Sequence, residues 1–272
     1  MPDCIKFKID IADAAIKEIL IALLSAAGAN GFEEEKNILK AFIPENEIAV
    51  LAVEKIIKEN NVSYLKSVIK EKNWNAEWES DFKPVAIGNF CTIRASFHET
   101  DNNTQHDIII TPKMSFGTGH HATTYMMVQA MEGLDFKDKT IFDFGTGTGV
   151  LSVLAEKCGA QSIVAIDIDE WSIVNAMENF NLNNCHKILL TKAEEFMFEN
   201  QYDIILANIN RNIILQNLEK MKQHLSNNGV LLLSGLLTGD EPVIVGEAQR
   251  NNLKLQKKSE MNGWICLLMV NG

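Results

Sequence analysis

The sequence predicts an α/β protein in which a small ferredoxin-like α/β domain (1–71) and a linker helix (72–84) precede a Rossmann-like domain with a seven-stranded sheet (85–272). Three observations predict this fold. Two short β-α-β units lie near the N-terminus, a strand, a glycine-rich turn and a helix follow one another at 140–158, and an Asn-Gly turn separates two strands near the C-terminus. Alternating apolar residues indicate strands, and apolar residues three and four apart indicate helices.

Size, charge and cysteine content limit the possible functions. The 272 residues carry a net charge of −11, so no direct nucleic-acid binding is expected, because no basic excess is present to replace phosphate counterions. The excess acidity in residues 74–272 suits a basic substrate and is equally typical of ordinary solubility charge. The five cysteines form no C-x-x-C pair, and no signal-peptide run or long apolar stretch is present. We therefore expect a soluble, cytoplasmic protein without a disulfide framework, a zinc site or a membrane segment.

The N-terminal domain is predicted to contain three strands and two helices. Alternation predicts strands over 4–11, 37–43 and 62–69, and apolar residues at helical spacing predict helices over 13–28 and 47–59. This order suggests a small ferredoxin-like sandwich. The domain contains no histidine, so we interpret it as a recognition or docking module.

The linker carries an aromatic stripe. Trp74, Trp78 and Phe82 are spaced at i, i+4 and i+8, which places them on one face of a short helix that Pro84 ends. Such stripes pack onto a domain more often than they bind a ligand, and both interpretations stay open.

Two strand-like segments, 85–97 and 106–111, lead to a glycine-containing loop and a helix start near Thr124. Hydroxyl groups at a helix start usually cap the helix. The hydroxyl of Thr124 and the free backbone N–H groups there can equally hold a ligand carboxylate. The adjacent side chains of His120 and His121 diverge and have no acidic partner close in sequence, so no metal site is expected.

Residues 140–151 form the stretch most typical of a ligand site. Three β-forming residues lead to Asp143, and Gly145, Gly147 and Gly149 follow at alternate positions before a helical pattern begins. Glycine permits a tight turn and lets a ligand lie against the main chain. The dinucleotide-binding fingerprint requires a glycine at its sixth position, where this chain has a valine. The remaining acid-G-x-G-x-G pattern resembles the first motif of S-adenosylmethionine-dependent methyltransferases, and a glycine-rich turn without a ligand is the alternative.

Two polar residues end buried strands. Asp167 lies near the carboxyl end of the predicted strand 162–169, about twenty residues beyond the glycine loop, where a carboxylate can accept hydrogen bonds from ribose hydroxyls. Helix capping is the alternative role, although Asp169 fits it better. Asn208 lies at the end of the strand 202–209, on the sheet edge where open α/β sheets bind ligands, and its amide can accept a hydrogen bond from an amine. A turn asparagine is the alternative there.

The remaining elements complete the larger domain. We predict helices near 170–180, 214–225 and 240–252 and strands over 187–191, 229–235, 253–261 and 264–270. The Asn262-Gly263 turn is the strongest short hairpin signal, so the sheet is expected to finish with an antiparallel strand. A dinucleotide-binding fold would normally add a parallel βα unit instead. We therefore expect seven strands with helices on both faces.

Motifs along the whole chain resemble the PrmA family, the bacterial methyltransferases of the large-subunit ribosomal protein numbered eleven. They follow the family order at family-like spacings, at 73–84, 115–124, 142–149, 166–169 and 207–209. The F-G-T-G…T-T and W-x-x-x-W elements are more specific than the glycine loop. The resemblance implies an S-adenosylmethionine-dependent methyltransferase domain behind a substrate-recognition domain, with a linker that lets the two move.

The resemblance also implies the site residues, the cofactor and the partner. The cofactor-binding residues that it implies are Phe116, Gly117, Thr118, Thr124, Gly145, Gly147, Asp167 and Asn208. S-adenosylmethionine is the implied methyl donor. Lysine ε-amines and/or the N-terminal α-amine of the ribosomal protein are the implied acceptors, and the enzyme is expected to be a monomer.

Three stretches depart from the family pattern. His120 and Ala122 stand where the family has threonine and proline, and Thr146 and Thr148 stand in a loop that usually reads G-C-G-S-G. Residues 209–212 replace the usual I-L-A-G. This last departure lies at the expected entrance for the amine, so it bears on substrate choice.

The implied reaction is direct transfer of a methyl group to a neutral amine. A free lysine has a pKa of about 10.4, so it must lose a proton before it attacks. An apolar channel favours the neutral form, and Asn208 would orient the amine as the catalytic residue. Two alternatives remain: a methyltransferase of another protein or of a small molecule, and a non-catalytic nucleotide-binding protein.

Overall fold

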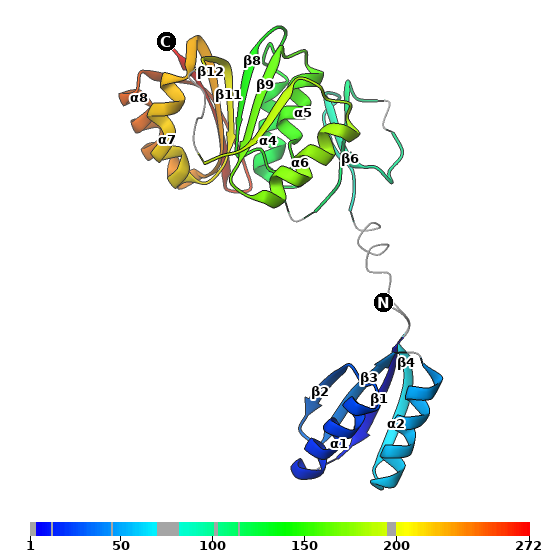
Figure 1. Cartoon of the computed structure of the whole chain (residues 1–272). Helices are drawn as coiled ribbons and strands as arrows, with labels where there is room; N and C mark the ends of the chain where they lie inside the picture. The colour runs from blue at the N-terminus through cyan, green and yellow to red at the C-terminus, as the bar shows by residue number, and fades with distance from the viewer. Residues whose placement is uncertain are drawn as a thin grey trace. The chain divides into compact units, whose positions relative to one another are not determined.

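The computed structural model describes residues 4–11, 13–44, 46–69, 82–100, 103–113, 115–194 and 200–272. The chain divides into two compact units, Met1–Asp81 and Phe82–Gly272, whose elements are labelled in Figure 1. The predicted helix over 72–84 lies outside the described residues except for 82–84, which have no regular secondary structure. Among the described residues, no helix is long and apolar enough to cross a membrane.

The smaller unit packs two helices against a four-stranded antiparallel sheet with the order β2-β3-β1-β4 (Figure 1). Its elements are β1 (Cys4–Asp10), α1 (Ala14–Ala26), β2 (Gly31–Glu35), β3 (Ile38–Pro44), α2 (Glu47–Glu59) and β4 (Ser63–Ile69). Phe7 of the sheet, Leu20 of α1 and Val53 of α2 are fully buried in its core. The predicted strands and helices form here with end shifts of one or two residues.

Strand β2 is absent from the sequence-based prediction. It contains three consecutive glutamates, and glutamate is depleted in strands. The strand forms because it pairs antiparallel with β3, where Lys40 makes ion pairs with Glu33 and Glu35 across the two strands. Cross-strand pairing, rather than local propensity, therefore determines this element.

The larger unit contains a seven-stranded sheet with the order β10-β9-β8-β11-β12-β14-β13. Its strands are β8 (Thr140–Phe144), β9 (Ser162–Asp167), β10 (Ile188–Lys192), β11 (Tyr202–Asn208), β12 (Leu225–Leu237), β13 (Leu253–Met261) and β14 (Trp264–Asn271). Strands β8 to β12 run parallel, and β14 is antiparallel to both of its neighbours. Asn262 and Gly263 both have positive φ in the β13–β14 hairpin, as this turn type requires.

Helices cover both faces of this sheet (Figure 1). Helices α4 (Ala122–Met131), α5 (Val150–Lys157) and α6 (Glu170–Leu182) lie on one face, and α7 (Arg211–Gln223) and α8 (Glu241–Arg250) lie on the other. Along β11, Ile204 and Leu206 pack into the core beneath α4 to α6, whereas Ile205 and Ala207 pack beneath α7 and α8. Because side chains alternate along a strand, Asn208 projects to the α4 side, two residues after Leu206.

A separate three-stranded sheet precedes α4. It consists of β5 (Val85–Ile87), β6 (Cys91–Ala95) and β7 (His106–Ile110) in that order. The predicted strand over 85–97 is therefore divided in two by a turn at 88–90, where Gly88 has a φ of 53°.

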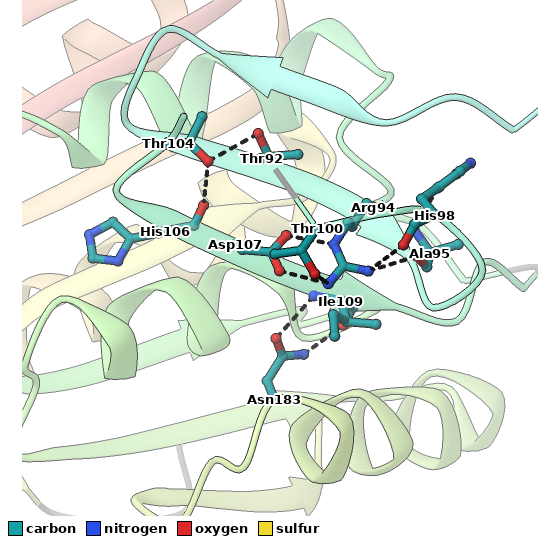
Figure 2. Close-up of polar contacts among 10 residues, drawn as sticks. All are labelled: Thr92, Arg94, Ala95, His98, Thr100, Thr104, His106, Asp107, Ile109 and Asn183. Carbon is teal, nitrogen blue, oxygen red and sulfur yellow. Dashed lines mark hydrogen bonds and ion pairs between the residues drawn. The ribbon is translucent and has the colours of Figure 1, made fainter. Parts of the chain in front are cut away.

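Arg94 of β6 joins this sheet to the loop that follows it, as Figure 2 shows. Its guanidinium donates to both carboxylate oxygens of Asp107 on β7 at 2.8 Å, to the carbonyl of His98 at 2.9 Å and to the hydroxyl of Thr100 at 3.1 Å. A bidentate pair fixes the orientation of both side chains. The buried arginine thus fastens the β6–β7 connection to the sheet.

Candidate functional site

A cavity of about 600 Å³ opens at the carboxyl ends of the parallel strands β8, β9, β10 and β11. Open α/β sheets bind ligands at this edge, and the volume lies in the range of small-molecule sites. The cavity is lined by five of the residues that the sequence predicted, namely Phe116, Gly145, Gly147, Asp167 and Asn208.

The glycine loop between β8 and α5 has left-handed backbone at all three glycines. The angle φ is 75° at Gly145, 57° at Gly147 and 80° at Gly149. A Cβ atom at Gly147 would overlap the carbonyl oxygen of Phe116, and one at Gly149 would overlap the ring of Phe180. Glycine is therefore required by both the backbone angles and the packing. At Gly145 and Gly147 bare main chain lines the cavity.

The loop that precedes α4 lies against the glycine loop. The carbonyl of Phe116 accepts from the backbone N–H of Thr148 at 2.9 Å, and the carbonyl of Gly117 accepts from the Thr148 hydroxyl at 2.7 Å. Phe116 lines the cavity and is half exposed. Gly117 and Thr118 do not line it, and the Thr118 hydroxyl lies 3.3 Å from Nδ1 of His120. The structure therefore brings Phe116 to the cavity and gives Gly117 a supporting position.

Asp167, at the end of β9, lies beneath the glycine loop. One carboxylate oxygen accepts from the backbone N–H of Gly147 at 2.8 Å, and the other accepts from the N–H of Asp169 at 3.0 Å. Each oxygen can accept a further hydrogen bond from a ligand hydroxyl. Asp169 caps α6 by accepting from the N–H of Trp171 at 2.9 Å, so the capping role falls to Asp169 and not to Asp167.

Asn208 and Thr124 are 84 residues apart in sequence but in contact. Asn208 Nδ2 donates to Thr124 Oγ1 at 3.3 Å. Thr124 is fully buried in the first turn of α4, so it orients the asparagine amide and does not line the cavity. The Oδ1 of Asn208 is buried and has no hydrogen-bond partner among the described residues. A buried carbonyl oxygen without a partner costs free energy, and a hydrogen-bond donor on a ligand would remove that cost.

Asp143, the acid before the glycine loop, supports the loop from within and does not line the cavity. Its Oδ2 accepts from the hydroxyls of Thr146 and Ser152, both at 2.6 Å. Burial raises the pKa of Asp143 to about 6, and the two hydroxyl donors oppose this shift. Asp143 therefore holds the turn in place while its own charged form is destabilised.

We expect Asp143 to lower the free energy of unfolding as the pH rises from about 4 to about 6. Its pKa is higher in the folded chain than in the unfolded chain, so protonation favours the folded state, and this contribution is lost as the pH passes the folded pKa. Urea denaturation of the wild type and of Asp143→Asn at several pH values measures the effect. The wild-type stability minus the variant stability should fall across this interval and stay level above it. A difference that does not change with pH would contradict the assignment.

The adjacent histidines have separate packing roles. His121 caps α4 by accepting from the N–H of Thr123 at 3.3 Å, and its ring packs against Trp264. The ring of His120 packs against Phe82 at 4.8 Å between centroids. In the part of the chain that the structure describes, no group of three or more histidine, cysteine or acidic side chains is arranged to hold a metal ion.

Several cavity residues lie outside the motifs that the sequence singled out. Ala193 and Glu194 follow β10, and Asn217 and Lys220 come from α7. The strand-end rule could have found Ala193 and Glu194, because they come directly after a strand. The α7 residues carry no such signal, since their position at the cavity depends on how the helix packs.

The cavity combines bare main chain, a carboxylate, an orphaned amide oxygen and apolar side chains. The carboxylate suits ribose hydroxyls, the apolar side chains suit a flat base, and the amide oxygen suits an N–H donor. These groups fit a ligand that contains a nucleoside.

Comparisons with known proteins identify one family along nearly the whole chain. A family model described as Ribosomal protein L11 methyltransferase (PrmA) matches residues 9–271. Two curated relatives carry the name Ribosomal protein L11 methyltransferase. The one from Bacteroides thetaiotaomicron is 36% identical over 260 residues, 93% of each chain, and the one from Chlorobaculum tepidum is 41% identical over 270 residues, 94% of this chain and 93% of the relative. The crystal structure of ribosomal protein L11 methylase from Lactobacillus delbrueckii subsp. bulgaricus has a TM-score of 0.65 at 28% identity, covering 69% of this chain and 98% of that chain.

Proposed function

The chain belongs to the ribosomal protein L11 methyltransferase (PrmA) family, and we propose that it transfers methyl groups from S-adenosylmethionine to ribosomal protein L11. The observation that carries the proposal is the orphaned Oδ1 of Asn208 at the edge of a nucleoside-sized cavity. Asn208 lines the cavity together with Asp167 and the glycine loop, and a ligand N–H that reached its Oδ1 would complete the hydrogen bonding of that oxygen. Family and geometry therefore support the same reaction.

The residues of the cavity fit S-adenosylmethionine. Asp167 would accept hydrogen bonds from the ribose hydroxyls, and the main chain at Gly145 and Gly147 would lie against the cofactor. Phe116 would cover it, with Gly117 and Thr118 shaping that loop and Thr124 holding Asn208 in position. When bound, the cofactor supplies an electrophilic methyl group on a positively charged sulfur.

Asn208 is the proposed catalytic residue, and its role is to orient the acceptor amine. A lysine ε-amine with its usual pKa of about 10.4 is protonated at neutral pH, so it must enter in its neutral form. The apolar side chains of Phe116 and Ile209 in the cavity disfavour a charged ammonium and so favour loss of the proton. Oδ1 of Asn208 then accepts one N–H of the neutral amine and aims the nitrogen lone pair. Positioning rather than a strong base supplies the rate acceleration.

The two units have separate proposed roles. The β-α-β-β-α-β order and the strand order β2-β3-β1-β4 of the smaller unit support a ferredoxin-like domain, to which we assign recognition of the ribosomal protein. The strand order of the larger unit and its antiparallel β14 support a Rossmann-like methyltransferase domain. We place the enzyme in the cytoplasm as a monomer. With a net charge of −11 it would recognise protein rather than nucleic acid.

Methyl transfer to ribosomal proteins tests the proposal. Ribosomal proteins from a strain that lacks this enzyme would be incubated with it and with labelled S-adenosylmethionine, and intact masses would be recorded. We expect a mass gain on L11 alone, and peptide mapping would identify the lysines or the α-amine that carry it. A gain on another protein would overturn the substrate. Failure of the protein to bind S-adenosylmethionine in calorimetry would overturn the reaction as well.

A further inference from the structure

Three asparagines spaced four residues apart bond the strand end at 109–111: Asn175 and Asn179 of α6, and Asn183 at its C-cap. Asn183 donates to the carbonyl of Ile109 at 2.6 Å and accepts from its N–H at 3.0 Å, as Figure 2 shows. Asn175 donates to the carbonyl of Thr111 at 3.1 Å, and Asn179 accepts from the Thr111 N–H at 2.8 Å. Spaced four residues apart, these side chains share one helix face. They form hydrogen bonds with backbone N–H and carbonyl groups along the outer edge of β7, which is the last strand of its sheet and, among the described residues, has no neighbouring strand on that side.

Asn179 differs from the other two because its amide also reaches the glycine loop. Its Nδ2 donates to the carbonyl of Thr148 at 2.8 Å while its Oδ1 accepts from the N–H of Thr111. The side chain is fully buried. One planar amide therefore fixes the distance between the glycine loop and the segment that leads into the loop before α4.

Thr148 completes the link to that loop. Its N–H donates to the carbonyl of Phe116 at 2.9 Å, and its hydroxyl donates to the carbonyl of Gly117 at 2.7 Å. Thr148 is fully buried, so water does not compete for these hydrogen bonds. The two loops are also packed too closely at Gly147 to admit a methyl group. The arrangement of both loops therefore depends on Thr148 and on the amide that holds its carbonyl.

We propose that Asn179 and Thr148 are positioning residues that hold the two loops lining the cavity in the geometry that binds S-adenosylmethionine. Neither residue lines the cavity. Both act through Phe116 and Gly147, which do line it. Loops that are ordered before binding lose less conformational entropy when the ligand arrives, so loss of the link weakens binding. This inference rests on the proposed function, because it takes S-adenosylmethionine as the ligand.

The test compares full-length Asn179→Ala with Asn183→Ala as the matched control. Both variants remove an amide that bonds the strand end at 109–111. Asn183 makes both of its hydrogen bonds there with Ile109, whereas Asn179 makes one with Thr111 and the other with Thr148 of the glycine loop. We expect Asn179→Ala to raise the Kd for S-adenosylmethionine about tenfold in calorimetry, the scale of one buried hydrogen bond, and to leave kcat at saturating cofactor within about threefold. Without cofactor, hydrogen exchange of the glycine-loop amides should also accelerate in Asn179→Ala. Asn183→Ala should lower the melting temperature and leave both readouts unchanged.

Equal Kd values in Asn179→Ala and the wild type, or equal losses of affinity in the two variants, would overturn the inference. If Asn179→Ala does not fold, Thr148→Val and Thr148→Ser replace it. Valine lacks the hydroxyl that bonds Gly117, whereas serine keeps it, so serine should recover most of the affinity that valine loses. Equal affinity in this second pair would also overturn the inference. A wild-type protein that binds no S-adenosylmethionine would overturn the proposed function itself. The comparison between variants tests only the positioning role, so the two failures can be distinguished.

Discussion

Asn208→Ala is expected to lower kcat for methyl transfer about 100-fold, the scale of a misplaced reacting group, and to change the Kd for S-adenosylmethionine far less. The substitution removes the orphaned Oδ1 that is proposed to aim the amine, together with the hydrogen bond to Thr124. Asp167 and the glycine loop remain in place to hold the cofactor. Single-turnover kinetics at saturating cofactor, together with calorimetry, separate the two effects.

Two variants sharpen this prediction. Asn208→Asp keeps an acceptor oxygen but adds a negative charge, which raises the pKa of the incoming amine, so its residual activity should move to higher pH than that of the wild type. Asn181→Ala removes an exposed asparagine of α6 and should leave turnover unchanged. Full turnover in Asn208→Ala with normal cofactor binding would eliminate the proposed role of Asn208.

Asp167→Ala is expected to raise the Kd for S-adenosylmethionine about 100-fold. Two charge-assisted hydrogen bonds to ribose hydroxyls would be lost, and each contributes roughly a factor of ten or more. The variant also removes the acceptor for the Gly147 N–H, which lies 2.8 Å from the carboxylate. Isothermal titration calorimetry with the cofactor and with its demethylated product measures the change directly.

A second variant separates the contribution of the negative charge of Asp167 to cofactor affinity from the contribution of its side-chain shape. Asp167→Asn keeps one acceptor oxygen and should lose about tenfold in affinity, less than the alanine variant. Asp135→Ala is the control, because its carboxylate is exposed, does not line the cavity and, among the described residues, accepts only from the N–H of Lys137 at 3.0 Å. An unchanged Kd in Asp167→Ala would show that this carboxylate does not bind the cofactor.

Much of the fold could be predicted because its signals are local. Asn262-Gly263 forms the predicted hairpin, and alternation or helical spacing marks most of the strands and helices at their observed positions. The sequence also identified four residues that line the cavity, each of which ends or follows a buried strand. They are Gly145 and Gly147, the carboxylate of Asp167 and the amide of Asn208. Parallel strands bring their carboxyl ends to one edge, so residues at these positions are expected to meet.

Other features had no local signal. Strand β2 forms from glutamates because β3 pairs with it, and the strand predicted over 85–97 is divided by the turn at 88–90. The asparagines of α6 look like ordinary polar positions of a helix until the edge of β7 is packed against them. Their buried hydrogen bonds exist only in the folded chain.

By itself, the sequence determined which residues end the strands and which loop can adopt left-handed backbone angles. Strand ends depend on neighbouring residues, and left-handed angles depend on glycine. Only the tertiary structure decided what those residues face. The sequence offered a helix cap or a ligand contact as the role of Thr124, and packing of α4 on the sheet makes it the hydrogen-bond partner of Asn208. Thr148 became the junction of two loops in the same way. Contacts between residues far apart in sequence depend on how whole elements pack, and no short stretch of sequence contains that information.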